Sequence, residues 1–504
     1  MKTLSPQARW LSVRSLFALA LCAAGVSLVL VSFAAGPQPG AAPVTKIAPW
    51  VLEQTADGNT SEFLVVLAEQ ADLSAADALA SKSEKGRYVR DMLWRAAQET
   101  QEPVLAALRA RGLEHRAYYI VNLIWAKGSL EDALAIAARA DVARIEGNPL
   151  IHNIIDPLPQ DTTAADIPQS TTAVEPGVSY SRAPEVWATG FTGQGIVVGG
   201  SDTGYRWTHA ALKGKYRGWN GATADHNYNW HDSIHSGGGV CGPNSTQPCD
   251  DNGHGTHTIG TAVGAEGANQ IGMAPGAQWI GCRNMNQGNG TPVTYLECME
   301  FFLAPYPVGG TTAQGDPAKA PDVTTNSWGC PPEEGCSANT LQQAFAAQRA
   351  AGIMTVVSAG NIGPACSTVS EPPSIYESNY TVGALVTGSD NLASFSSRGP
   401  VTSDGGSRRK PDLTAPGTST RSAAASSDVG YANLSGTSMA TPHVAGAVAL
   451  LLSAKPALIG DVAAIHTALN RSAVHLLASG CGDATAVSPN NLFGYGRLDA
   501  KVAV

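Results

Sequence analysis

The sequence predicts an α/β fold in which helices cover both faces of a parallel β-sheet, with a small α+β unit in front of it. From residue 181 onward, short apolar runs alternate with helical stretches, a pattern typical of parallel sheets. One run, 195–200, leads directly to Asp202, as expected at the carboxyl end of a parallel strand. Residues 61–152 carry a separate β-α-β-α-β pattern, which predicts the smaller unit.

The composition indicates a globular protein with two or three domains. The chain has 504 residues, of which 43% are hydrophobic and 14% are charged. It can therefore bury a large core and does not have the composition of a disordered chain. The formal net charge of −9 argues against a surface that follows nucleic-acid phosphates. We expect no nucleic-acid partner.

The N-terminal residues, 1–35, have the pattern of an export signal. Lys2, Arg9 and Arg14 precede an apolar run over residues 16–35, and the small residues near Ala34 would allow cleavage there. The run is also long enough to remain as a membrane anchor. We expect a secreted or cell-envelope protein, and both fates of the run stay open.

Two linkers are predicted to flank the smaller unit. Residues 36–60 begin with a stretch rich in Pro, Gly and Ala. Residues 153–180 are rich in Pro, Asp, Thr and Ser, and exposed linkers of this kind are where chains are cut. Between them, 61–152, the pattern predicts strands over 63–67, 118–125 and 142–145 and helices over 83–111 and 129–139.

The larger domain, 181–504, contains further candidate elements. Its expected strands cover 195–200, 278–281, 321–327 and 352–358, and its expected helices cover 340–350 and 443–452. This alternation implies right-handed crossovers between parallel strands. Polar residues that follow the strands should then gather at one edge of the sheet.

Ser438 lies in a turn of small residues that leads into the last helix. Unpaired N–H groups at a helix start favour negative charge, so a nucleophile there can pass its developing oxyanion to them. A hydroxyl needs a base, for which His254 is the candidate, and Asp202 would orient that base. Taken singly, the serine could equally be an ordinary helix cap.

The segments around Asp202, His254 and Ser438 resemble the motifs of the subtilisin-like serine peptidases, in the same chain order. The resemblance extends over about residues 183–499 and is greatest to the bacillopeptidase F-like secreted peptidases. It implies a subtilisin-like sandwich and a serine endopeptidase that acts on protein or peptide substrates through an acyl-enzyme. It also implies that 61–152 is a ferredoxin-like propeptide, which inhibits the peptidase until the precursor cuts itself. We expect a monomer that needs no cofactor for catalysis.

The resemblance also assigns roles around the catalytic residues. It makes Asn361 a side-chain donor to the oxyanion, although a Gly-Asn turn after a strand would look alike. Substrate should bind as an added extended strand. The residues implied in substrate binding are Ser327, Trp328, Gly329, Gly288, Gly290 and Ser370.

Eight cysteines follow residue 240, and an even number in an exported chain indicates disulfides. The local pairs Cys241–Cys249 and Cys330–Cys336 are favoured. A zinc site at Cys241, Cys249, His254 and His257 is the competing interpretation, weakened by the lack of a C-x-x-C spacing.

One departure from the family concerns calcium. Ala211 stands where many members have an aspartate that binds the ion, and carboxylates are a main source of calcium affinity. A structural calcium is therefore doubtful here. Disulfides could supply the stability instead, because closing long loops adds a few kcal/mol each.

The sequence argues against two other functions. A catalytically silent homologue that binds peptides would not need Asp202, His254, Ser438 and Asn361 together. An esterase of the α/β-hydrolase type would carry a G-x-S-x-G motif and the order Ser, Asp, His, which this sequence does not have. The preferred side chain at the cleaved bond is not indicated by the sequence.

Overall fold

The computed structural model describes residues 43–152 and 174–504, apart from residue 268. The predicted signal or anchor, 1–35, and most of the predicted processing linker lie outside these residues. Residues 41–504 group into one compact unit, which contains both the smaller unit and the larger domain.

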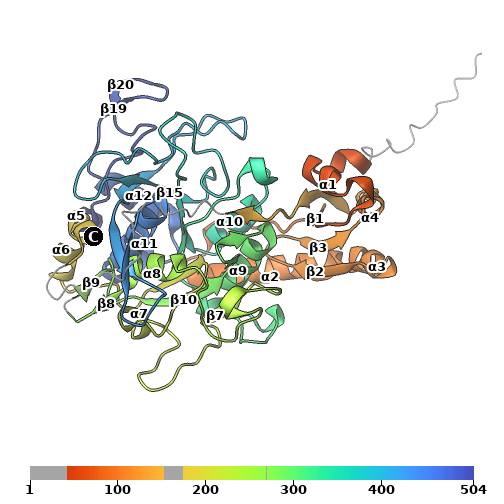
Figure 1. Ribbon diagram of the computed structural model, residues 1–504, viewed down its shortest axis with the longest axis horizontal. Helices are drawn as coiled ribbons and strands as arrows, with labels where there is room; N and C mark the ends of the chain where they lie inside the picture. The colour runs from red at the N-terminus through yellow and green to blue at the C-terminus, as the bar shows by residue number, and fades with distance from the viewer. Residues whose placement is uncertain (1–42, 153–173, 268) are drawn as a thin grey trace, which may run out of the picture. The chain divides into compact units, whose positions relative to one another are not determined.

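A seven-stranded sheet, parallel throughout, forms the centre of the larger domain (Figure 1). The predicted parallel α/β fold is thus confirmed. In spatial order the strands are β16 (Leu413–Pro416), β15 (Tyr380–Leu385), β14 (Met354–Ser358), β13 (Val323–Asn326), β6 (Val197–Asp202), β10 (Gln278–Arg283) and β7 (Trp230–Asp232).

Helices cover both faces of this sheet. On one face, α8 (His254–Val263) and α11 (Thr437–Ala454) share a core with β6, β13, β14 and β15. On the other face, α9 (Pro292–Leu303) and α10 (Gln342–Ala350) share a second core. Among the described residues, α11 alone is long and apolar enough to cross a membrane, but 83% of it is buried in the domain. It is therefore the central core helix.

The smaller unit has a β-α-β-β-α-β order, which is the ferredoxin-like arrangement. Its antiparallel sheet has the strand order β2-β3-β1-β4. The elements are β1 (Ser61–Leu67), α2 (Lys82–Thr100), α3 (Glu102–Ala110), β2 (Glu114–Tyr118), β3 (Leu123–Gly128), α4 (Leu130–Ala137) and β4 (Val142–Gly147). Strand β1 alternates between two cores: Phe63 and Val65 pack against α3 and α4, whereas Leu64 and Val66 belong to the core that contains α9 and α10.

The structure differs from the sequence expectation in three places here. The single helix over 83–111 is two helices, because Pro103 near the start of α3 cannot continue the hydrogen-bond ladder of α2. The single strand predicted over 118–125 is in fact part of a hairpin of two strands, β2 and β3. The polar strand β2 was not predicted. The stretch 36–60 contains the helix α1 (Pro49–Gln54), whose Val51 is buried in the smaller core. The capping box predicted at Ser129 is confirmed.

The remaining elements lie around these two units. The other helices are α5 (Pro176–Tyr180), α6 (Ala183–Trp187), α7 (Ala210–Lys213), α12 (Val462–Ser472) and α13 (Ala500–Ala503). The short strands are β5 (Ile151–His152), β8 (Ala265–Glu266), β9 (Asn269–Gln270), β11 (Met285–Asn286), β12 (Asn289–Gly290), β17 (Thr420–Ala423), β18 (Tyr431–Leu434), β19 (Ala478–Gly480) and β20 (Asp483–Val487).

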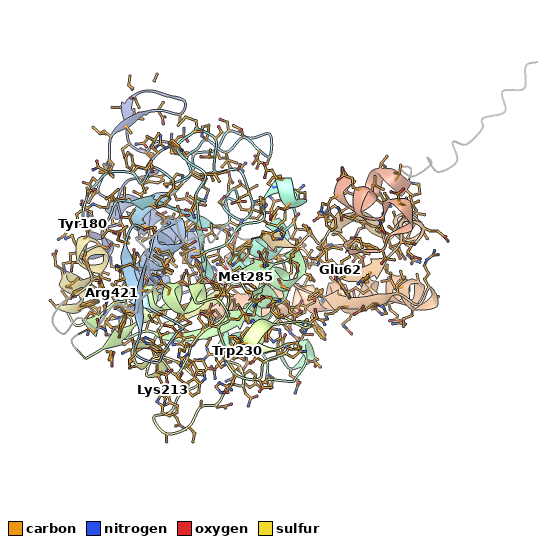
Figure 2. The ribbon with its side chains drawn as sticks, viewed as in Figure 1. Glu62, Tyr180, Lys213, Trp230, Met285 and Arg421 are labelled. Carbon is orange, nitrogen blue, oxygen red and sulfur yellow. A yellow bond between two sulfur atoms is a disulfide. The ribbon has the colours of Figure 1, made fainter. Side chains whose placement is uncertain are left out.

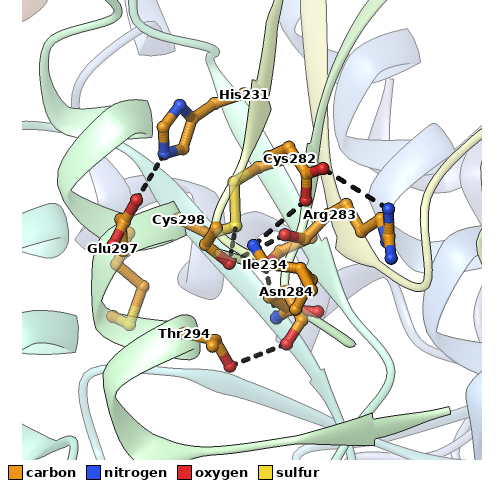
Figure 3. The surroundings of a disulfide bond; sticks show 12 residues. His231, Ile234, Cys282, Arg283, Asn284, Thr294, Glu297 and Cys298 are labelled. Atoms are coloured by element: carbon orange, nitrogen blue, oxygen red, sulfur yellow. Dashed lines mark hydrogen bonds and ion pairs between the residues drawn. A yellow bond between two sulfur atoms is a disulfide. The ribbon is translucent and has the colours of Figure 1, made fainter. Parts of the chain in front are cut away.

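All eight cysteines after residue 240 form disulfides. The predicted local pairs, Cys241–Cys249 and Cys330–Cys336, are confirmed. The other two are Cys282–Cys298, which joins β10 to α9 (Figure 3), and Cys366–Cys481, which links residues 115 apart. Because Cys241 and Cys249 are bonded to each other, they are not available to zinc, and that alternative is wrong. Among the described residues no group of three or more His, Cys, Asp or Glu side chains could hold a metal ion.

Candidate active site

Asp202 and His254 form a buried pair at the carboxyl edge of the central sheet. Asp202 is the last residue of β6, and His254 is the first residue of α8. His254 Nδ1 donates to Asp202 Oδ1 at 2.7 Å, and both side chains are at most 2% exposed. The carboxylate also accepts from the Thr203 N–H at 2.8 Å and from the Thr258 hydroxyl at 3.1 Å. These contacts fix the imidazole so that its other nitrogen, Nε2, faces away from the aspartate.

Ser438 is the second residue of the core helix α11, directly after Thr437. Its hydroxyl donates weakly to the Ser327 carbonyl at 3.4 Å, and the Ser327 hydroxyl donates to the Ser438 carbonyl at 3.0 Å. Among the described residues, the buried Nε2 of His254 has no hydrogen-bond partner. A base nitrogen without a partner is what an incoming proton requires, and such bonds often form only once substrate is bound.

Asn361 lies at the start of the same helix. Its Oδ1 accepts from the Thr437 N–H and from the Thr437 hydroxyl, each at 2.9 Å. These two bonds determine which end of the amide faces Thr437, so the Nδ2 donor is on the other side. A methyl group added to Gly436 would come within 3.5 Å of Asn361 Nδ2 and 3.6 Å of the Ser438 nitrogen. Two donors, Asn361 Nδ2 and the Ser438 N–H, therefore lie near the same point beside Gly436.

A pocket of about 390 Å³ opens next to Ser438 and Asn361. Residues that follow β13 and β14, two neighbouring parallel strands, form its walls. Of the six residues predicted to bind substrate, Ser327, Trp328, Gly329 and Ser370 line this pocket. The indole of Trp328 stacks on Tyr295 with ring centroids 4.1 Å apart, which holds this residue of the lining in place.

The other two predicted residues, Gly288 and Gly290, do not line this pocket. Gly290 is in β12, where it pairs with Ile151 of β5 in a three-stranded antiparallel sheet. Gly288 is in the tight turn before β12, with φ +88°, a conformation that favours glycine. The segment 151–152 is thus already bound as an added strand at this edge, and His152 also lines the pocket.

The surroundings of Ala211 do not suit calcium. The residue is buried in α7, which His209 caps by accepting from the Ala211 N–H at 3.1 Å. The His209 ring packs edge-on against Tyr431, with centroids 5.2 Å apart. Tyr431 in turn has a cation over its ring.

That cation is Arg421, which is labelled in Figure 2. Its guanidinium lies 4.1 Å from the centroid of the Tyr431 ring. Its Nη1 donates to Glu175 Oε1 at 2.8 Å and to Asn269 Oδ1 at 2.9 Å. The oxygens of Glu175 and Asn269 that could have bound calcium are therefore bound to the guanidinium of Arg421. Its positive charge would also repel a calcium ion. This set of residues does not fit calcium.

We expect disulfides, not a metal ion, to determine thermal stability. The Cys366–Cys481 bond closes a loop of more than a hundred residues, for which the chain-entropy model gives about 4–5 kcal/mol. EDTA should leave the melting temperature of the purified chain unchanged, while dithiothreitol should lower it by several degrees. Differential scanning calorimetry with both reagents measures this, and a large fall with EDTA alone would contradict it.

Three features of the site were missed by the sequence analysis. Thr258 donates a hydrogen bond to Asp202. It lies four positions after His254 in the same helix, and this spacing, which puts both residues on one face, could have suggested it. Glu300 of α9 accepts from the backbone N–H groups of Tyr119 and Ile120 in the smaller unit. Glu371 lines the pocket beside Ser370. The last two depend on contacts between distant segments, for which the sequence gives no signal.

Comparison with known proteins matches residues 193–496 to the Subtilase family. Bacillopeptidase F of Bacillus subtilis (strain 168) is 34% identical over 460 residues, 87% of this chain, and the match spans 30% of that protein's length. Serine protease AprX of the same strain is 32% identical, over 64% of this chain and 70% of the relative. Subtilisin DY of Bacillus licheniformis is 32% identical, over 60% of this chain and 91% of the relative. The chain therefore belongs to the subtilase family of serine peptidases.

Proposed function

We propose that the chain is an endopeptidase precursor that hydrolyses peptide bonds with Ser438 as nucleophile, His254 as base and Asp202 as its orienting partner. The observation that carries the proposal is the buried 2.7 Å bond between Asp202 and His254 Nδ1, which leaves Nε2 without a described partner at the edge where Ser438 lies in the first turn of α11. The names of AprX and of the subtilisin relative support the same chemistry.

The mechanism follows from these positions. His254 Nε2 takes the proton from Ser438 Oγ as that oxygen attacks the substrate carbonyl. The negative charge that develops on the carbonyl oxygen is met by the Ser438 N–H and by Asn361 Nδ2. His254 then gives its proton to the leaving amine, which leaves an acyl-enzyme, and water repeats the sequence. Asp202 stays ionised and stabilises the imidazolium.

The smaller unit would act as an intramolecular inhibitor. Strand β5, at its C-terminal end, pairs with β12 next to the pocket, in the manner in which an extended peptide adds to a sheet edge. Glu297 of α9 accepts from Arg116 Nη1 and the Tyr118 hydroxyl, each at 2.9 Å. Glu300 accepts from the N–H groups of the following turn. The unit thus covers the edge at β12, where substrate would bind, until the chain is cut. The proposed region of the cut is the predicted linker 153–180.

Glu300→Ala should weaken the hold of the cut prosegment on the peptidase. The variant leaves the Tyr119 and Ile120 N–H groups without their acceptor, at 2.6 and 3.0 Å in the parent. The expected loss is about ten- to a hundredfold in affinity. It is measured from the dilution at which the processed, non-covalent complex gains casein-degrading activity.

Glu300→Gln is the matched control. Burial raises the pKa of Glu300 to about 8, so the carboxyl is mostly protonated at pH 7 and glutamine keeps both its shape and an acceptor oxygen. This variant should behave like the parent within about threefold. Equal affinities for the alanine variant and the parent would rule out the proposed docking role.

The chain is proposed to work outside the cytoplasm. Four disulfides among the described residues fit an oxidising compartment. Whether the apolar run 16–35 is removed or stays as an anchor is tested by N-terminal sequencing of the mature protein.

Labelling with a fluorophosphonate tests the function directly. This reagent esterifies an activated serine, so the mature chain should gain one label on Ser438 and lose casein hydrolysis in proportion. A folded chain that takes no label and leaves casein intact would be a silent peptide-binding homologue. In that case Asp202 and His254 would have a structural role only.

A further inference from the structure

A carboxylate reaches the pocket beside the proposed nucleophile. Glu371 lines this cavity together with Ser438 and Asn361. A methyl group added to Gly329 would come within 2.7 Å of Glu371 Oε1, and one added to Gly360 would come within 3.6 Å. The carboxylate therefore lies close to two glycines of the pocket lining, neither of which has a side chain that could cover it.

The pocket as a whole is acidic. Besides Glu371, its lining includes Glu333 and Glu334, whereas no lysine or arginine lines it among the described residues. The one basic side chain is His152 of the smaller unit, whose Nδ1 lies 3.1 Å from Glu334 Oε1. Removal of the prosegment would take His152 away from Glu334.

Glu371 has no stabilising partner of its own within the described structure. Burial and the negative charges of Glu333 and Glu334 raise the pKa of its carboxyl to about 7, and no bond lowers it. A buried carboxylate without a cation is unfavourable. A cationic group that entered the pocket would relieve that cost by pairing with it.

We propose that Glu371 determines cleavage specificity by selecting lysine or arginine as the residue whose carbonyl is attacked. The proposal rests on the function proposed above, because that residue's side chain enters the pocket next to Ser438 and Asn361. The 390 Å³ cavity, lined in part by Gly329 and Gly360, leaves room for an unbranched chain of methylene groups, and the Glu371 carboxylate binds the ammonium or guanidinium at its end. An apolar side chain would instead cover the Glu371 carboxylate without forming an ion pair with it.

The test compares peptides that differ only at the residue before the cleaved bond: lysine, arginine, leucine, phenylalanine and glutamate. At pH 8, where Glu371 is ionised, kcat/KM for lysine and arginine should exceed that for leucine and phenylalanine by about ten- to a hundredfold. Glutamate should be the poorest. Glu371→Gln should reduce the preference to within about threefold, while the leucine peptide is still cut.

Glu377→Gln is the matched control, because Glu377 is 81% exposed and does not line the pocket. Its preference should equal that of the parent. Benzamidine gives a second measurement that needs no variant: the cation should inhibit the parent competitively, and uncharged benzamide should not.

The outcomes separate the two proposals. If the parent cuts the leucine and phenylalanine peptides as well as the lysine and arginine peptides, Glu371 does not select cations, although the peptidase proposal stands. The same conclusion follows if Glu371→Gln retains the full preference. If the parent cuts none of the peptides and takes no fluorophosphonate label, the peptidase proposal itself fails.

Discussion

Ser438→Ala is expected to abolish both casein hydrolysis and self-cleavage of the chain. The substitution removes only Oγ, whose one hydrogen bond among the described residues is the weak bond of 3.4 Å to the Ser327 carbonyl. Folding should therefore be little affected, whereas turnover should fall about 10⁶-fold, as expected when a triad nucleophile is removed. Mass spectrometry of the purified chain should show trimming within residues 153–180 in the parent and a full-length variant.

A second serine of the same helix provides the control. Ser453 lies in the last turn of α11, at the opposite end of the helix from Ser438. Ser453→Ala removes a hydroxyl that donates to the Leu450 carbonyl at 2.8 Å. This variant should process itself and degrade casein like the parent. Trimming of Ser438→Ala at the parent's rate would assign the cut to another protease, and casein hydrolysis by that variant would exclude Ser438 as nucleophile.

The sequence predicted those parts of the site that short segments encode. Asp202, His254 and Ser438 each lie in a local motif at the end of a strand or the start of a helix, and the parallel sheet brings these ends to one edge. The orientation of Asn361 could not be predicted, because Thr437, 76 residues away, determines it.

Other features depend on folding at long range. Arg421 binds Glu175 across 246 residues of chain, so the guanidinium could not be predicted from the sequence, although Ala211 was already a reason to doubt calcium. Glu371 follows the predicted Ser370 directly, yet its role depends on Gly329 and Gly360, which come from different strand ends. In the smaller unit, β2 was missed because its residues, EHRAY, are largely polar and only Tyr118 is buried.

Asp202→Asn should lower turnover by about 10⁴-fold while the fold is kept. In the parent, the carboxylate accepts from His254 Nδ1 at 2.7 Å, which keeps the proton on Nδ1 and leaves Nε2 free to act as the base. An asparagine that turns its amide nitrogen toward the ring would donate to Nδ1 instead. The proton of the neutral imidazole would then be on Nε2, and His254 could not accept the proton of Ser438.

The size of this effect distinguishes an electrostatic role of Asp202 from a purely packing role. Thr258→Val is the control, because it removes the hydroxyl, which contacts Asp202 Oδ2 and the Gly255 carbonyl at 3.1 Å each, and leaves the bond between Asp202 and His254 in place. We expect its turnover to fall less than about tenfold. Single-turnover acylation by a chromogenic ester measures both variants, and circular dichroism checks that they are folded. If Asp202→Asn acylated within tenfold of the parent, the tautomer of His254 would not depend on Asp202, and the orienting role assigned to the aspartate would be wrong.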